Sequence, residues 1–335
     1  MKEIIINDKD AGQRFDKLLV RYLGNAPVSF LYKMMRKKNI TLNGKKASGK
    51  EMLSKGDIVR IFFSDETYEK FTTKTTEILQ PKVQPLERSK IIYEDMNILV
   101  ADKPAGVLSQ KSKTTDISIN EEILKYLLES GELTSDDMAR VRPSVCNRLD
   151  RNTSGLILAG KTLAGLQTLS ELLRSREFHK YYLCLVHGKM EGTQRLDGYL
   201  WKNEKNNKVT VLSEEQIQSG TYHDAKPIST RYHVLGSDGE VTLLEVLLIT
   251  GRSHQIRAHL ASIGHPILGD VKYGKANASG CLEKKYDLKY QLLHSYKMIF
   301  PEITGKLSYL SGQTFEAPLP KTFDRIVKEH IKGEN

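Results

Sequence analysis

A carboxylate stands between two cations where a polar turn meets an apolar run. Residues 147–158 read NRLDRNTSGLIL, so Asp150 is flanked by Arg148 and Arg151. An aspartate beside a buried strand can serve as a nucleophile or as a general acid or base. The same Asp-Arg-Asn-Thr-Ser-Gly sequence is also a good turn, in which an aspartate commonly caps backbone amides. The segment alone leaves both interpretations open.

A second polar motif further along the chain could supply a partner for that carboxylate. Residues 250–270 read TGRSHQIRAHLASIGHPILGD, and we expect Ser253 to cap a helix there. His254 and Arg257 share one face of this helix. The guanidinium of Arg257 could bind a carboxylate through two hydrogen bonds. A partly buried Asp150 would need such a partner to stay ionised at neutral pH, because burial alone raises the pKa of a carboxyl group.

The composition excludes several classes of protein. With 39% hydrophobic and 27% charged residues, the chain is typical of soluble globular proteins, and its 335 residues suggest about two domains. No apolar run approaches the ~20 residues that cross a bilayer, and the start MKEIIINDKD lacks the pattern of a secretory signal. The three cysteines are far apart, which suggests neither disulfides nor a zinc site. His254 and His259 also lack the spacing of a zinc-binding helix, so we expect a cytoplasmic protein without a metal or a membrane partner.

Positive charge is concentrated at the N-terminus. The net charge is +10, and residues 1–65 contain 14 Lys/Arg against 7 Asp/Glu, which is +7 of that total. A compact basic module suits binding to a polyanion such as nucleic acid. A solvated basic face without a partner would have the same composition.

Two short helices and a hairpin are predicted within this basic module. Apolar residues recur at helical spacing between Arg14 and Leu23, and a second helix that begins near Pro27 ends in the basic run RKK. That run could serve only to complement the C-terminus of its helix. The dipeptide Asn43-Gly44 predicts a hairpin turn, and residues 58–63 have the pattern of a strand.

These elements resemble the S-four-type RNA-binding domain, which is named after a protein of the small ribosomal subunit. FDKLLVRYL, KMMRKKNITLNGK and LSKGDIVRI occur in the expected order within residues 12–63, and we place the domain at residues 12–65. Residues 66–88 are polar and contain two prolines, so we predict a linker there. Residues 89–325 form the second domain. The resemblance implies contacts with RNA phosphates from five cations, Arg36, Lys37, Lys38, Lys45 and Lys46.

The second domain contains strand and helix patterns without the regular rhythm of a parallel sheet. Strands are predicted at residues 90–93, 98–101, 156–159, 181–186, 229–235 and 241–248, and helices at residues 120–130, 163–176 and 254–263. We therefore predict a mixed α+β fold with a largely antiparallel sheet.

The motifs of this domain resemble those of RluA-type RNA pseudouridine synthases. NRLDRNTSGLIL is followed in the family's order by KYYLCLVHGK, TGRSHQIRAHL and HPILGDVKYG, and KPAGVLSQ, DAKPISTRYHVL and LLHSYKMIF also fit. The resemblance spans residues 89–325. It implies a central mixed, mostly antiparallel sheet flanked by helices, with a cleft across it. It also implies the isomerisation of uridine in RNA to pseudouridine, without a cofactor or metal.

The resemblance assigns roles to individual residues. Asp150 matches the catalytic aspartate, and Arg257 matches the arginine that pairs with it. Tyr182 matches the tyrosine that packs on the target base and could remove its carbon-five proton. Arg148 matches the side chain that fills the stack after the base has left. If the strand register is off by one residue, Tyr181 takes the place of Tyr182, because successive side chains point to opposite faces.

Other residues of these motifs have supporting roles. We expect Arg252 and His254 to contact RNA, together with the cations named above. Lys103 is expected to be an exposed loop lysine. The apolar run 156–158 and the ring of Tyr182 would line a pocket that excludes water, which matters because water would turn isomerisation into hydrolysis.

The sequence supports one leading hypothesis and leaves alternatives. The leading hypothesis is a monomeric enzyme that isomerises uridine in large-subunit ribosomal RNA, with transfer RNA as the second substrate class. The carboxylate could act as a nucleophile at the sugar or at the ring, or as a base at the ribose. A rival hypothesis is a non-catalytic RNA-binding factor of ribosome assembly, whose effects would not depend on Asp150. A metal-dependent RNA hydrolase would instead cleave its substrate and be inhibited by a chelator.

Overall fold

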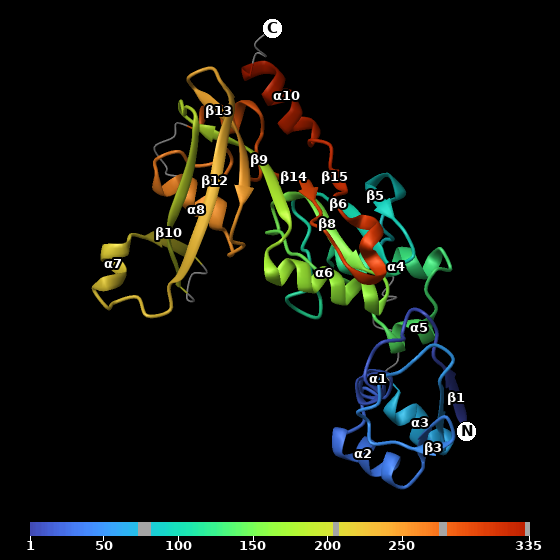
Figure 1. The fold of residues 1–335 in the computed structure, drawn as a ribbon. Coiled ribbons are helices and arrows are strands. Elements are labelled where there is room, and N and C mark those ends of the chain that lie inside the picture. The colour runs from blue at the N-terminus through green and yellow to red at the C-terminus, as the bar shows by residue number, and fades with distance from the viewer. Residues whose placement is uncertain (73–81, 204–207, 275–279, 332–335) are drawn as a thin grey trace.

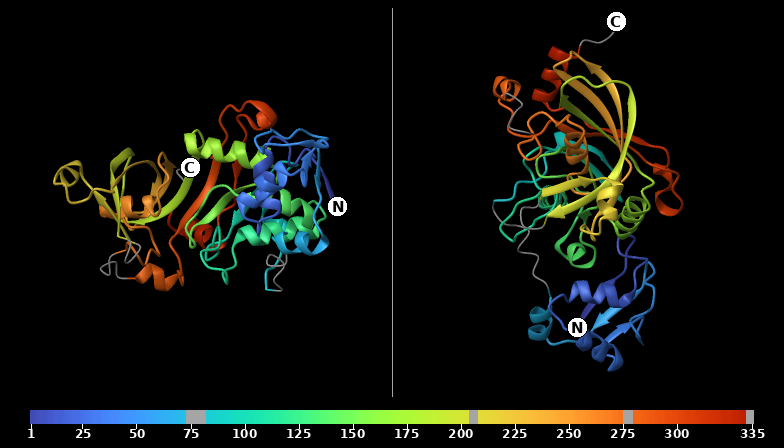
Figure 2. Two further views of the ribbon diagram at one scale, coloured as in Figure 1. Left: turned by 90° about the horizontal axis from the view of Figure 1, so that it is seen from below. Right: turned by 90° about the vertical axis from the view of Figure 1, so that its left-hand side faces the viewer.

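The chain folds into a small N-terminal module and a larger second domain (Figure 1). The computed structural model describes residues 1–72, 82–203, 208–274 and 280–331. The module lies at one end of the molecule, and the further views show the same arrangement (Figure 2). Helix α5 (Ser135–Arg140) of the second domain provides much of the contact between the two parts.

The N-terminal module packs two helices against a four-stranded antiparallel sheet. The strand order is β1-β4-β2-β3. The apolar face predicted for the first helix is buried, since Phe15, Leu18 and Leu19 are fully inaccessible to solvent. Asn43 and Gly44 both have positive φ angles, 51° and 72°, which is the geometry of the predicted hairpin turn. The elements are β1 (Lys2–Ile5), α1 (Phe15–Tyr22), α2 (Val28–Arg36), β2 (Ile40–Leu42), β3 (Lys45–Lys46) and β4 (Ile58–Ile61).

The predicted linker begins later in the structure than in the sequence prediction. Helix α3 (Asp65–Phe71) occupies the first part of residues 66–88, and Ser64 caps it by accepting a hydrogen bond from the amide of Thr67 at 3.3 Å. Tyr68 and Phe71 pack against the core of the module, so this helix belongs to the module. Periodicity did not indicate it because the helix has only two turns and buries no residue completely. Residues 73–81 of the predicted linker lie outside the described residues.

The second domain is built on one large mixed sheet. Its strand order is β11-β10-β12-β13-β9-β14-β8-β6-β5, with β15 on β14 and β7 on β8. Among the described pairings, β14 with β8 is parallel and the others are antiparallel, which confirms the predicted fold class. The strands are β5 (Ile91–Glu94), β6 (Ile98–Lys103), β7 (Ser144–Val145), β8 (Ser154–Gly160), β9 (His179–His187), β10 (Thr193–Asn203), β11 (Lys208–Leu212), β12 (Lys226–Ser237), β13 (Val241–Leu248), β14 (Leu293–Ile299) and β15 (Thr314–Glu316).

Helices cover both faces of this sheet. Leu156 and Leu158 of β8 face the core beneath α6 (Leu163–Ser175), and Ile157 faces the opposite core beneath α4 (Ile119–Glu129). We had predicted that the run 156–158 lines a pocket with Tyr182, and this prediction is wrong. Alternation along the strand divides it between two cores. The remaining helices are η2 (Arg88–Lys90), α7 (Glu214–Gln218), α8 (Gln255–Ser262), α9 (Cys281–Lys285), η3 (Gly305–Leu310) and α10 (Lys321–His330).

None of the helices in the described ranges combines the length and apolar character that crossing a bilayer requires.

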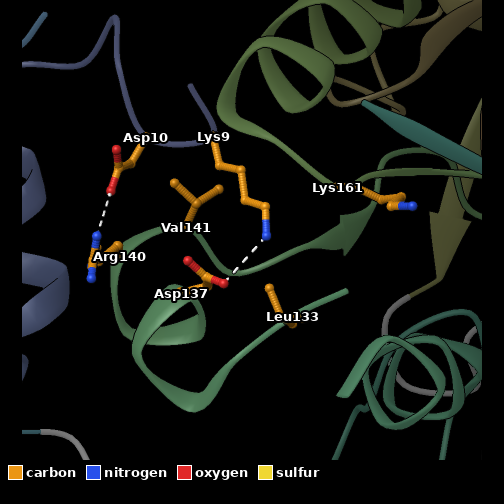
Figure 3. Close-up of a pocket in the computed structure, with 7 residues that line it drawn as sticks. All are labelled: Lys9, Asp10, Leu133, Asp137, Arg140, Val141 and Lys161. Atoms are coloured by element: carbon orange, nitrogen blue, oxygen red, sulfur yellow. Dashed lines mark hydrogen bonds and ion pairs between the residues drawn. The ribbon is translucent and has the colours of Figure 1, made fainter. Parts of the chain in front are cut away.

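The N-terminal module and the second domain meet at an ionic seam (Figure 3). Arg140 pairs with Asp10 at 3.4 Å and with Asp136, and Lys9 Nζ lies 3.3 Å from Asp137 Oδ2. A small hollow lies at this seam, and a second one of about 480 Å³ adjoins it. Neither hollow is lined by a residue of the predicted catalytic site.

Candidate active site

The predicted site lies where the two halves of the large sheet join. Strand β14 pairs with β8 over two residue pairs, His294 with Ser154 and Ser295 with Gly155, whereas it pairs with β9 over six. Gly155 has a φ of +110°, and a Cβ there would lie 2.2 Å from the carbonyl oxygen of Ser295. Only glycine fits so close an approach. The turn that carries Asp150 immediately precedes this junction.

Asp150 is held by the predicted arginine. Arg257 on α8 donates from Nη1 to Asp150 Oδ2 at 2.9 Å, across 107 residues of sequence. The side chain of Asp150 is 23% exposed, and that of Arg257 is 8% exposed. Within the described part of the chain, Asp150 Oδ1 has no hydrogen-bond partner and no backbone amide is capped by this carboxylate. The backbone-capping alternative is therefore not what the structure shows.

A second carboxylate fixes the guanidinium from behind. Arg257 donates from Nε and Nη2 to the two oxygens of Asp270 at 2.7 and 2.9 Å, and the side chain of Asp270 is fully buried. Burial would lower the pKa of Arg257, but the hydrogen bonds and charge of Asp270, and then those of Asp150, raise it overall. The guanidinium of Arg257 is therefore always charged. Two of its nitrogens bind Asp270, and the third, Nη1, binds Asp150.

The start of α8 differs from the prediction. Ser253 does not cap the helix. The residue at the N-cap is His254, in the left-handed conformation with a φ of 56°, and it makes no capping bond. Gln255 instead holds this turn, because its Oε1 accepts hydrogen bonds from Thr250 Oγ1 and from the amide of Arg252. Its Nε2 donates to β12. We did not assign a role to Gln255 from the sequence, because a glutamine at this position does not by itself indicate that it holds the turn.

The two neighbouring tyrosines point to opposite faces of β9. Tyr182 is buried in an apolar cluster that includes Leu149, next to Asp150 in the chain. Burial raises the pKa of Tyr182 to about 12, and the charge of Asp150 contributes to the same shift. Tyr181 lies on the other face, with Lys297 Nζ 4.6 Å from its ring centroid. Tyr182 is therefore the tyrosine on the side of the carboxylate.

Lys103 is not the exposed loop lysine that we had predicted. It is fully buried at the end of β6, and its Nζ donates to the carbonyl oxygens of Pro104, Val107 and Arg151 at 2.9, 2.8 and 3.1 Å. Burial lowers the pKa of Lys103 to about 7, while the charge of Asp150 opposes this shift. Lys103 thus ties the KPAG loop to the turn that carries the candidate catalytic carboxylate.

Comparison with known proteins agrees with this arrangement. The RNA pseudouridylate synthase family matches residues 97–262. The chain is 33% identical to the ribosomal large subunit pseudouridine synthase C of Vibrio vulnificus (strain CMCP6), over 97% of this chain and 96% of that one. It is 30% identical to the ribosomal large subunit pseudouridine synthase D of Borreliella burgdorferi, over 82% and 78% of the two chains.

The chain belongs to the RluA-type family of RNA pseudouridine synthases. It is an RNA-uridine isomerase, and its partner is RNA. The solved structure of human RNA pseudouridylate synthase domain containing 4 has the same fold, with a TM-score of 0.56 and 22% sequence identity over 72% of this chain and 92% of that chain.

In this pseudouridine synthase the residues predicted to meet RNA fall into two groups. Arg148 and Arg252 flank the carboxylate and guanidinium in sequence. Both side chains are exposed, and neither makes a hydrogen bond or ion pair with the described residues. His254 differs, because it is largely buried beside Asp150 and contacts Tyr273. Asn147 is structural, since it bonds to the carbonyl of Leu156 and the amide of Leu158 on β8.

The second group lies on the N-terminal module of the synthase. Its five cations, Arg36, Lys37, Lys38, Lys45 and Lys46, are all exposed. In the described part of the chain none of them forms an ion pair. Exposed cations without an ion pair suit phosphate contacts better than a structural role. Their role in RNA binding stays a prediction.

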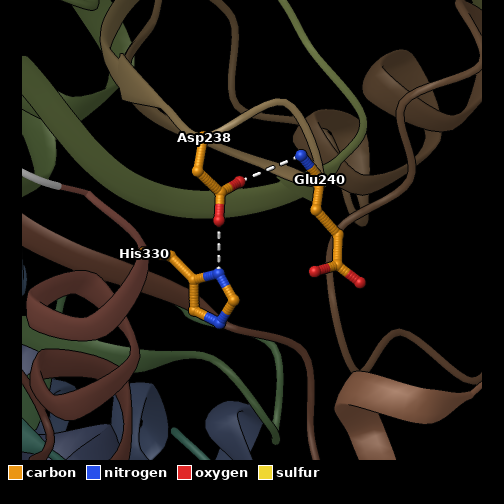
Figure 4. Close-up of side chains that lie close together, drawn as sticks. All are labelled: Asp238, Glu240 and His330. Atoms are coloured by element: carbon orange, nitrogen blue, oxygen red, sulfur yellow. Dashed lines mark hydrogen bonds and ion pairs between the residues drawn. The ribbon is translucent and has the colours of Figure 1, made fainter.

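One group of residues elsewhere could be mistaken for a metal site (Figure 4). Asp238, Glu240 and His330 bring three potential ligand atoms together. Their contacts have a structural explanation, because the Asp238 carboxylate accepts hydrogen bonds from the amides of Glu240 and Val241 and pairs with His330 Nδ1 at 2.6 Å. The group closes the β12–β13 turn and ties α10 to it.

Proposed function

We propose that this synthase isomerises uridines of large-subunit ribosomal RNA, with Asp150 as the catalytic carboxylate. Two relatives that cover most of the chain carry the name ribosomal large subunit pseudouridine synthase. The basic N-terminal module supports a large folded RNA as substrate, because it adds phosphate contacts outside the active site.

One observation carries the assignment of Asp150. Arg257 occupies Oδ2 of the carboxylate, while Oδ1 has no partner among the described residues. The ion pair with Arg257 orients this carboxylate and leaves one of its oxygens for the substrate. Attack on the sugar, attack on the ring and proton removal at the ribose all require that same free oxygen.

The neighbouring residues fit the steps around this chemistry. A uridine must leave its stack before a carboxylate can reach its glycosidic bond, which costs a few kcal/mol. In this proposal Tyr182 packs on the everted base and shields it from water. Arg148, exposed and without a partner among the described residues, fills the space left in the RNA. Acceptance of the carbon-five proton by Tyr182 would first require loss of the phenolic proton, which its raised pKa disfavours at neutral pH.

We also propose that the enzyme works in the cytoplasm as a monomer. Cys146, Cys184 and Cys281 are free thiols, which suits a reducing compartment. Fractionation of cells that express a tagged chain tests the location. Sedimentation equilibrium of the purified protein, with and without RNA, tests the monomer.

The decisive experiment compares two isosteric substitutions. Asp150→Asn removes the charge of the candidate catalytic carboxylate, and Asp197→Asn removes that of an exposed aspartate paired with Arg195. Each protein is incubated with unmodified large-subunit ribosomal RNA or transfer RNA, and pseudouridine is measured by nucleoside mass spectrometry. We expect Asp150→Asn to lower the single-turnover rate by at least about 10³-fold, with the RNA dissociation constant within a few-fold of wild type. Asp197→Asn should behave like wild type.

Other outcomes would decide against parts of the proposal. Full activity in Asp150→Asn would exclude Asp150 as the catalytic group. Modification of transfer RNA alone would show that transfer RNA, and not large-subunit ribosomal RNA, is the substrate. No pseudouridine from the wild-type protein on either RNA would favour the non-catalytic assembly factor.

A further inference from the structure

A histidine stands beside the catalytic carboxylate. His254 Nε2 lies 3.8 Å from Asp150 Oδ2, and the side chain of His254 is 14% exposed. This distance is too long for a hydrogen bond, but such contacts in substrate-free active sites commonly tighten when substrate binds. The oxygen that His254 approaches is the one already bound by Arg257.

The opposite nitrogen of this histidine is fixed by a tyrosine hydroxyl. His254 Nδ1 lies 2.8 Å from the hydroxyl of Tyr273. The backbone amide of Val209 on β11 donates to that same hydroxyl at 3.1 Å. An amide can only donate, so the hydroxyl accepts there and keeps its single proton, which can be donated to His254 Nδ1. In that arrangement Nδ1 is the acceptor, and a neutral ring carries its proton on Nε2.

The surrounding charges agree with a neutral ring. Burial lowers the pKa of His254; the charge of Asp150, and that of Asp270, oppose this shift, while Arg257 and Lys272 reinforce it. The ring of Tyr273 packs edge-on against the imidazole at 5.6 Å and lies beneath the Arg257 guanidinium at 5.2 Å. A second full positive charge is disfavoured where a permanent cation already holds the carboxylate.

We propose that His254 is a positioning residue, a neutral imidazole locked as the Nε2–H tautomer by Tyr273, which donates to Asp150 Oδ2 when RNA fills the site. The proposal rests on the proposed catalytic role of Asp150. With Oδ2 bound by Arg257 and His254 together, Oδ1 becomes the reacting oxygen, and its direction toward the nucleotide is fixed. His254 thus acts on the carboxylate, which differs from the RNA contact predicted from the sequence.

The tautomer can be measured without any activity assay. Nitrogen-15 NMR of histidine-labelled, RNA-free protein distinguishes the two neutral tautomers from the imidazolium ion. The signals of His254 among the nine histidines are found by difference from His254→Gln. We expect an unprotonated Nδ1 and a protonated Nε2 at neutral pH, with the preference lost in Tyr273→Phe. An imidazolium, or a proton on Nδ1, would overturn the proposal and leave the role of Asp150 untouched.

Kinetics provide the second test. We expect His254→Leu to lower the single-turnover rate at saturating RNA by about 10²-fold, with an unchanged RNA dissociation constant. His254→Gln keeps a side-chain N–H donor and should recover part of the rate, and Tyr273→Phe should fall between Gln and Leu. Tyr286→Phe is the matched control, because it removes a tyrosine–histidine hydrogen bond (to His330, 2.9 Å), together with a bond to Glu329, in a core cluster separate from that of Leu149 and Tyr182. Thermal unfolding verifies that each variant is folded.

The opposite kinetic pattern would assign His254 to RNA binding. In that case His254→Leu would raise the RNA dissociation constant and flatten its salt dependence, while the rate at saturation stayed at the wild-type value. That result overturns the proposal. Full activity in Asp150→Asn would instead overturn the proposed function, so the two failures are distinguishable.

Discussion

Two arginines in this molecule each join carboxylates from separate segments, and they do so differently. In the active site, Arg257 makes three hydrogen bonds of 2.7 to 2.9 Å, two to the fully buried Asp270 and one to Asp150. The pair with Asp270 is bidentate, which fixes the plane of the guanidinium. Its third bond reaches Asp150, whose other oxygen has no partner among the described residues.

At the seam, the hydrogen bonds of Arg140 connect the second domain to the N-terminal module. It bonds to Asp10 at 3.4 Å, to the carbonyl oxygen of Ile5 at 3.1 Å and to Asp136. Its buried Nε has no hydrogen-bond partner among the described residues. The comparison teaches that an arginine between carboxylates is not in itself a catalytic signature. The difference lies in rigid bidentate support and in an unoccupied oxygen on the outer carboxylate.

The largest expected effect comes from removing the active-site arginine. Arg257→Met removes the cation paired with the buried charge of Asp270 and leaves it only the amides of Lys272 and Tyr273, which should lower the free energy of unfolding by about 3–5 kcal/mol. It should also lower the single-turnover rate by about 10³-fold, because Asp150 is no longer oriented. Denaturant unfolding and single-turnover assays measure the two effects.

A second substitution separates structure from chemistry at this position. Adding Asp270→Asn to Arg257→Met removes the uncompensated charge and keeps an acceptor for the amides of Lys272 and Tyr273, so most of the lost stability should return. The rate should stay low, because Asp150 still lacks its partner. Recovery of both quantities would show that Arg257 acts only through folding.

The seam arginine should show the reverse pattern. Arg140→Met leaves the buried carboxylate of Asp10 without a cation and should destabilise the protein by about 2–3 kcal/mol. The single-turnover rate at saturating RNA should stay near the wild-type value, because no contact to Asp150 changes. Limited proteolysis of the folded protein and denaturant unfolding measure the loosened seam. A rate that fell as far as in Arg257→Met would erase the distinction between the two clusters.

Mild acid should lower the stability of the protein through a buried neutral histidine on β14, where the two halves of the sheet join. Burial lowers the pKa of His294 from 6.5 to about 4, and its ring bonds to Ser154 Oγ at 2.8 Å. Between these values the unfolded state binds more protons than the folded state, so stability falls as the pH falls. From pH 7 to pH 5 this group should cost about 2 kcal/mol. Denaturant unfolding should show a decrease that is smaller in His294→Asn than in the wild type by about this amount.

The smallest effect is expected on the outer surface of the module. Changing Arg36, Lys37 and Lys38 to Gln should raise the RNA dissociation constant by about tenfold and reduce its salt slope by about 2, because fewer counterions are released. The rate at saturation should not change. Lys321, Arg325 and Lys328 on α10 are exposed cations at the far end of the molecule (Figure 1) and form the matched control. Equal effects from both sets would show that the module has no special role.

Local signals in the sequence were sufficient for much of the fold. The helical spacing around Leu18 and Leu19 and the Asn43-Gly44 turn each lie within a few residues, and the structure has both. The capping box of Thr134 and Asp137 could have predicted α5 in the same way, although we did not use it. The sheet's strand order depends on contacts between distant segments, which periodicity does not contain.

The site shows the same limit. Family motifs selected Asp150 and Arg257 correctly as neighbours, and Asp270 stands inside a motif that we quoted without assigning it. The prediction that Lys103 is an exposed loop lysine was wrong. Its neighbours, proline and glycine, indicate a loop, whereas three carbonyl oxygens converge on it only after folding. The role of Gln255 also depends on a strand far away in sequence.

The short junction between β14 and β8 has a consequence for how the enzyme is assembled. One half of the sheet brings Asp150, and the other brings Tyr182 and Arg257, yet only two residue pairs join the strands between them. Each half can form its own hydrogen-bonded ladders before the halves meet. We therefore expect catalytic competence to appear late in refolding and to vanish before the bulk of the secondary structure melts.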